Sequence, residues 1–86
     1  MNDTKQFRTT RLPLAVLLHC TQQLEFAGCE LDQSGKAVFV FEDTESQGEN
    51  IELGFDQGKA QVDARAFATS ERFLRRKMYQ LLQGRL

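Results

Sequence analysis

The chain has few of the residue types and motifs that catalysis and metal binding usually require. It holds one histidine, His19, two cysteines and no tryptophan. Structural zinc sites use closely spaced ligands such as Cys-x-x-Cys, and Cys20 and Cys29 have no such spacing. A Gly-rich phosphate loop, a Gly-x-Ser-x-Gly nucleophile motif and a Cys/His pair at catalytic spacing are also missing. We therefore expect no enzyme, no metal and no cofactor, with His19 as a solvated side chain.

Long apolar runs and a cysteine framework are missing as well. The run from Leu12 to Leu18 is far shorter than the ~20 residues that a membrane-spanning helix needs. No basic segment precedes it in the manner of a signal peptide. Two cysteines are too few for a disulfide scaffold. The sequence favours free thiols in a reducing compartment, with a Cys20–Cys29 disulfide as the alternative. We expect a cytoplasmic protein with no membrane partner.

The apolar residues that are present suffice for one small core. The 86 residues are 41% hydrophobic and 27% charged, which is typical of a soluble globular domain. The polar segment 1–6 predicts a flexible N-terminus, followed by a single domain over residues 7–86. Seven phenylalanines predict a core of phenyl rings, which need no hydrogen-bond partner.

A first amphipathic helix is predicted near the N-terminus. Thr10 as N-cap, Pro13 in the first turn and Gly28 as C-cap predict a helix over about 11–27. Its leucines follow the 3.6-residue repeat, and His19 is expected on the opposite, polar face.

A longer helix is predicted at the C-terminal end. Asp63 as N-cap and Gly84 as terminator predict a helix over about 64–83. One face of this helix is apolar and holds Phe67, Ser70, Leu74, Met78 and Leu81. The opposite face is basic.

Between the helices the pattern predicts a β-hairpin. The segments 29–31 and 36–41 flank 32–35, which has the Asp, Ser and Gly of a tight turn. The second strand is apolar on both faces and the chain has few elements to cover both, which favours dimerisation.

Residues 45–58 fit either a helix or a strand. Ile51, Leu53 and Phe55 alternate with polar residues as in a strand, and Gly48 and Gly54 weigh against a helix. The predicted fold class is α+β: an N-terminal helix, a central antiparallel hairpin, a short third strand or helix, and a long C-terminal helix packed on the sheet.

Four motifs occur in a recognisable order. They are Phe7-Arg8-Thr9 leading into Leu14-Ala15, the segment Val38–Asp43, the segment Phe55–Ala60, and Val62-Asp63 with Phe67. Together they resemble a family of small bacterial proteins known as a domain of unknown function. The resemblance covers most of the chain, and it implies a helix between the Phe-Glu-Asp segment and the Gly-containing turn. The family has no assigned activity, so the resemblance implies an architecture and no chemistry.

The net charge is only -1, yet the charges are sorted along the chain. Residues 25–63 hold ten acidic residues against Lys36 and Lys59, whereas residues 64–86 hold six basic residues against Glu71. Such a dipolar chain is typical of a protein that binds a charged partner or itself.

We therefore predict a small non-catalytic interaction module that binds a protein partner or itself through opposed basic and acidic surfaces, so that a homo-oligomer is expected. The alternative is a nucleic-acid-binding protein, because arginines contact phosphates and a tyrosine can stack on a base. The candidate partner-binding residues are Arg65, Arg72, Arg75, Arg76 and Tyr79 on the basic side and Glu42, Asp43 and Glu45 on the acidic side.

Overall fold

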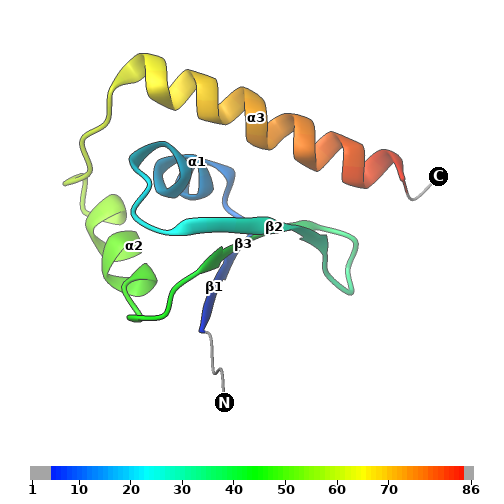
Figure 1. Ribbon diagram of the computed structural model, residues 1–86, viewed down its shortest axis with the longest axis horizontal. Coiled ribbons are helices and arrows are strands. Elements are labelled where there is room, and N and C mark those ends of the chain that lie inside the picture. The colour runs from blue at the N-terminus through cyan, green and yellow to red at the C-terminus, as the bar shows by residue number, and fades with distance from the viewer. Residues whose placement is uncertain (1–4, 85–86) are drawn as a thin grey trace.

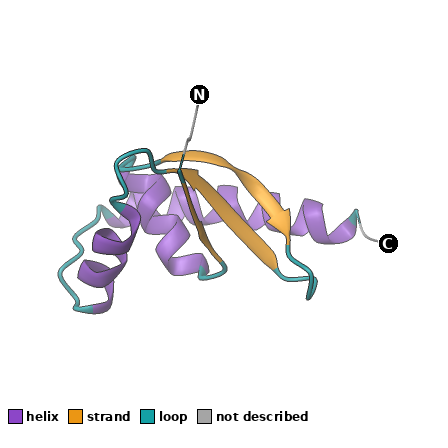
Figure 2. Ribbon diagram, turned by 90° about the horizontal axis from the view of Figure 1, so that it is seen from below, coloured by secondary structure: helices purple, strands orange, loops and turns teal. Residues whose placement is uncertain are grey.

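The computed structural model describes residues 5–84 and contains three helices and three strands. In chain order they are β1 (Gln6–Thr9), α1 (Leu12–Thr21), β2 (Glu25–Leu31), β3 (Ala37–Glu42), α2 (Gly48–Asp56) and α3 (Ala64–Gln83). The strands form an antiparallel sheet with the order β1-β3-β2. Helices α1 and α3 lie on one side of this sheet (Figure 1), and the opposite side faces the viewer in Figure 2. The predicted α+β class is confirmed.

The core lies between the central strand β3 and the two helices. Phe39 and Phe41 of β3 are buried against α1, together with Leu74 of α3, which has no exposed surface. Residues 14–18 of α1 are all buried, so this helix is apolar on every side. A helix of this kind has to be covered all round by other elements.

The other face of β3 carries Val38 and Val40, which are only 7% and 2% exposed. Arg8 of β1 lies opposite Val40, and Glu30 of β2 lies opposite Val38, so all four side chains share one face. The guanidinium of Arg8 and the carboxylate of Glu30 meet 2.6 Å apart, across β3. We infer that this ion pair covers the two valines. The doubly apolar strand is therefore buried within one chain and gives no reason to expect a dimer.

The N-terminal segment is more ordered than predicted. Gln6 is paired with Glu42 at the start of β1, and the backbone carbonyl of Lys5 accepts a hydrogen bond from Asp43 N. The expectation that residues 1–6 are flexible is therefore wrong for residues 5 and 6, and residues 1–4 lie outside the described part of the chain. This segment therefore begins β1, which completes the three-stranded sheet.

Helix α1 is shorter than the predicted range of 11–27. Its N-cap is Arg11, whose N–H donates to Thr9 Oγ1, and Pro13 lies in the first turn. Gln22 ends the helix with a left-handed φ of 57°. Gly28, predicted as the C-cap, instead lies within β2.

Residues 48–56 form a helix, so the strand interpretation of this segment is wrong. Ile51 and Phe55 pack against the core, whereas Leu53 is 56% exposed. The start of α2 is fixed by Asp43, which accepts hydrogen bonds from the backbone N–H groups of Gln47 (2.6 Å) and Gly48 (2.9 Å). A carboxylate on these otherwise unpaired donors stabilises a helix N-terminus.

Helix α3 has the predicted bounds. Asp63 caps it by accepting a hydrogen bond from Ala66 N at 2.9 Å, and Gly84 follows its last residue. Ser70 and Leu74 are buried on its inner face, as expected. Among residues 5–84, none of the helices combines the length and the apolar character that crossing a bilayer requires.

Candidate functional site

The outer face of α3 carries a cluster of exposed cationic side chains. Arg72, Arg75 and Arg76 surround a shallow hollow of about 430 Å³ together with Tyr79, Gln80 and Gln83. Tyr79 is 50% exposed, so much of its ring is open to solvent. We call Arg72, Arg75, Arg76 and Tyr79 the α3 basic face. The 3.6-residue repeat of the helix brings these four residues together, as the sequence predicted.

The arginines of this face differ in their electrostatic partners. Arg75 donates to Glu71 one turn earlier at 3.0 Å, and this bond, together with Tyr79, raises the pKa of Arg75. Arg72 and Arg76 make no ion pair within the described residues. Their charges are therefore available to a ligand outside the chain.

Arg65 lies on the same helix but apart from this cluster. It is exposed in the first turn, seven residues before Arg72, which corresponds to about 10 Å along the helix axis. It does not line the hollow. Arg65 therefore belongs to the basic side predicted for this helix but lies outside the α3 basic face defined above.

Among residues 5–84, the arginines outside α3 form ion pairs within the chain. Arg8 pairs with Glu30, and Arg11 pairs with Glu52 (2.9 Å) and Asp56 (2.7 Å). These contacts raise the pKa of Arg11, and Arg11 lowers the pKa of Asp56. Over residues 5–84, the arginines without an ion pair are Arg65, Arg72 and Arg76, all on α3.

The acidic candidates lie between β3 and α2 and have unequal exposure. Asp43 is only 6% exposed and uses both carboxylate oxygens to hold α2, so it is removed from the candidate binding surface. Glu42 is half-buried, and its Oε1 is buried without a hydrogen-bond partner among the described residues. Glu45 is exposed and accepts a hydrogen bond from Gln47 Nε2. No group of three or more Asp, Glu, His or Cys side chains in the described chain could hold a metal ion.

The basic and acidic candidates do not meet. Helix α3 lies along the top of Figure 1, the segment from β3 to α2 lies at lower left, and α1 lies between them. The structure therefore has two separate charged surfaces on one small domain, and they are not paired with each other.

His19 is not on a solvated face, so that prediction is wrong. It lies between the two helices, where Nδ1 is 2.7 Å from Ser70 Oγ and the imidazole stacks on Phe73 with centroids 4.9 Å apart. Loss of water on burial lowers the pKa of His19. The sequence held one signal for this contact, since a hydroxyl on the apolar face of a helix needs a polar partner.

The His19–Ser70 pair is a poor catalytic pair. A histidine can activate a serine, but Ser70 is 6% exposed. It also lies inside α3, where the backbone N–H groups are bonded along the helix and cannot stabilise an oxyanion. The contact joins α1 to α3.

Cys20 and Cys29 are free thiols, both half-buried. Burial raises the pKa of each, which disfavours the reactive thiolate. Neither thiol has the environment of a nucleophile.

Comparisons of the chain with protein-family models, with curated proteins and with solved structures find no match. The resemblance to the family of small bacterial proteins of unknown function therefore stays a prediction.

Proposed function

We propose that this protein is a non-catalytic interaction module that captures an acidic surface of another protein on the α3 basic face. The supporting observation is that Arg72 and Arg76, exposed and without an ion pair in residues 5–84, flank a hollow that also presents Tyr79. Arginine and tyrosine are the side chains that most often dominate the energetics of protein interfaces.

A protein partner fits this face better than a nucleic acid. Arg72 and Arg76 are four residues apart, about 6 Å along the axis, so the cluster matches roughly two phosphate spacings of one strand. Proteins whose DNA binding depends steeply on salt make about 6–10 phosphate contacts, which is more than this cluster can supply. The surplus of acidic residues in the rest of the chain also repels a polyanion.

A separate partner also fits better than a second copy. A two-fold dimer needs a self-complementary patch, whereas the basic and acidic surfaces lie on different sides of α1 (Figure 1). Self-association through both surfaces would join copies head to tail, as rings or open chains.

Free, poorly reactive thiols are consistent with the reducing cytoplasm that we propose as the location.

The test is fluorescence anisotropy with three labelled probes: a Glu-rich helical peptide, a single-stranded DNA and a single-stranded RNA of similar length. We expect the peptide to bind most tightly, and Arg72→Glu with Arg76→Glu to abolish that binding. The matched control is Lys5→Glu with Lys36→Glu, which reverses the same number of exposed charges away from α3.

Two results would contradict the proposal. Equal peptide binding by the α3 variant and the wild type would remove the basic face from the interaction. Tighter binding of an oligonucleotide, with the roughly 20-fold loss of affinity between 50 and 200 mM salt expected when three phosphates of a single strand are neutralised, would favour the nucleic-acid alternative. Light-scattering mass of the wild type reports whether copies associate.

A further inference from the structure

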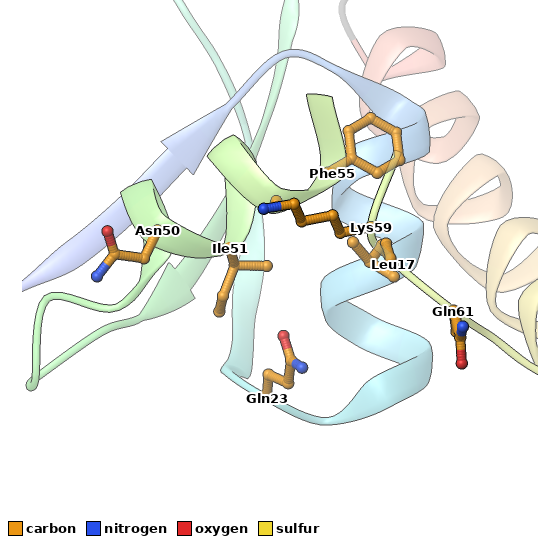
Figure 3. A pocket seen from close by; sticks show the side chains of 9 residues that line it. Leu17, Gln23, Asn50, Ile51, Phe55, Lys59 and Gln61 are labelled. Carbon is orange, nitrogen blue, oxygen red and sulfur yellow. The ribbon is translucent and has the colours of Figure 1, made fainter. Parts of the chain in front are cut away.

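A second hollow lies between α1, α2 and the connection from α2 to α3 (Figure 3). It is an open hollow of about 180 Å³, and its apolar lining residues, Leu17, Ile51 and Phe55, are buried or half-buried. The side chains of Ile51 and Gln23 point toward one another across it, and Lys59 extends along α2 toward Ile51. This hollow is remote from the α3 basic face and does not share any residue with it.

The rim of this hollow is polar and lacks partners in the protein. Gln23, Asn50 and Gln61 contribute side-chain amides, and none of the three makes a side-chain hydrogen bond within residues 5–84. Lys59 is the single charged residue among those that line the hollow, and its ammonium forms no ion pair in the described part of the chain. The acidic residues of α2 line a different hollow, beside β1. The rim can therefore donate hydrogen bonds and attract an anion.

The position of Lys59 is fixed by the turn that ends α2. Gly58 adopts a left-handed φ of 75°, and the N–H of Lys59 donates to the carbonyl of Gly54 at 2.9 Å. Such a turn holds the following backbone in one geometry. The amine therefore projects from an ordered point at the edge of the hollow.

Gly54 also lines the hollow and leaves open space beside the backbone of α2. Glycine inside a helix costs about 1 kcal/mol relative to alanine, yet an added Cβ at Gly54 would find nothing within 4 Å. The packing of the protein thus gives no steric reason for glycine here. A ligand that approaches the backbone of α2 would supply that reason.

We propose that this hollow binds a carboxylate that carries a short branched apolar tail. The carboxylate would pair with Lys59 and accept hydrogen bonds from the amides, while the tail would lie on Leu17, Ile51 and Phe55. At about 30 Å³ per water, the volume corresponds to roughly six waters, so the ligand holds about six to eight non-hydrogen atoms. Both a free short-chain acid and the last residue of a polypeptide have this chemistry.

The experiment is a titration of ¹⁵N-labelled protein, followed through the backbone amides of Ile51, Gly54 and Lys59. The probe is 3-methylbutanoate, with acetate and 3-methylbutan-1-ol as controls that lack the tail and the charge. We expect a dissociation constant in the range of 1 mM for the probe and weaker binding of both controls.

Substitutions test the same contacts. Lys59→Gln should weaken binding about threefold, the size expected for one exposed ion pair, whereas Lys36→Gln, at the exposed hairpin turn, should leave it unchanged. Gly54→Leu should abolish binding by filling the hollow, with its helicity checked by circular dichroism. Since Lys59 is exposed, its substitution tests the site even if Gly54→Leu does not fold.

A further arm distinguishes the two sources of the carboxylate. The probes are a tripeptide that ends in a free leucine and its C-terminal amide. If the free tripeptide binds at least tenfold more tightly than 3-methylbutanoate and the amide does not, the ligand is a chain end. If the tripeptide binds less tightly than this threshold, the ligand is a free acid. The proposal is overturned if the three amides do not shift with either probe, if the alcohol binds as well as the acid, or if Lys59→Gln binds equally well.

Discussion

The two glycines of α2 should respond to the same substitution in opposite directions. Helix propensity alone predicts that Gly→Ala stabilises a helix by up to about 1 kcal/mol at each position. Gly48, however, is buried against Phe7 and Asp43: an added Cβ would lie 2.5 Å from Phe7 Cγ and 2.9 Å from Asp43 Oδ2. Ordinary contacts between carbon atoms lie near 3.5–4.0 Å. Gly48→Ala therefore overpacks the site.

The expected magnitudes follow from the two environments. Overpacking typically costs about 1–3 kcal/mol, which outweighs the gain in propensity. For a domain of this size 1 kcal/mol corresponds to about 4–8 °C, so Gly48→Ala should lower Tm by roughly 5–15 °C. Gly54→Ala meets open space and should raise Tm by up to about 8 °C.

The assay is thermal unfolding followed by circular dichroism, with urea unfolding as a second measure. Phe7→Ala combined with Gly48→Ala should cost less than the sum of the two single substitutions, because truncation of Phe7 at Cβ removes the Cγ and Cδ1 atoms that the new methyl group would meet. If Gly48→Ala is as stable as the wild type or more stable, the packing of α2 on β1 described above is incorrect.

Three further predictions concern stability. Asp43→Ala should cost about 1–2 kcal/mol by releasing the two N–H groups at the start of α2, and Glu45→Ala, on the same loop, should change little; urea unfolding measures both. Because burial lowers the pKa of His19 below its ordinary 6.5, the unfolded chain binds the proton more tightly. The contribution of His19 to the free energy of unfolding is therefore complete above pH 6.5 and is lost as the pH falls through its folded pKa. The difference in unfolding free energy between wild type and His19→Gln should shrink from pH 7.5 to 5.5. An unchanged difference would argue against the buried, neutral imidazole. Leu74→Ala should lower the free energy of unfolding by about 2–5 kcal/mol in the same assay, because the side chain of Leu74 on α3 is fully buried in the core. A loss below about 1 kcal/mol would mean that α3 is not packed as described.

Helix α3 could be predicted from the sequence because several local signals agree. Asp63 caps its first turn, Gly84 follows its end, and the apolar and basic residues follow the same 3.6-residue repeat. The α3 basic face could be predicted once the helix was, because residues three and four positions apart lie on the same side of a helix. The exclusion of Arg65 from the hollow required the structure.

Helix α2 could not be distinguished from a strand because the two repeats share positions. Ile51 and Phe55 are four residues apart, which places them on one side of either a helix or a strand. Only Leu53 separates the alternatives, and it is exposed on the helix, although an apolar residue at that position suggested burial. The exposure of a single leucine cannot be read from its identity.

The remaining errors arise from contacts between distant segments. Strand β1 was not predicted because it forms only by pairing with β3, which lies far away along the chain. His19 appeared solvated because its neighbours Gln22 and Gln23 are polar, but α1 ends at Thr21 and these glutamines lie outside the helix. Such pairings depend on the complete fold, which local patterns do not encode.

Strand β2 carries an irregularity that bears on whether a foreign strand can pair with the edge of the sheet. Phe26 pairs with Phe41 and Gly28 pairs with Val40, so Ala27 is an extra residue on a strand that forms one edge of the sheet. A bulge at this point bends the strand and interrupts the regular row of amide and carbonyl groups that a foreign strand would need for continuous pairing. This seven-residue edge is thus a poor template for intermolecular sheet growth and amyloid-like aggregation.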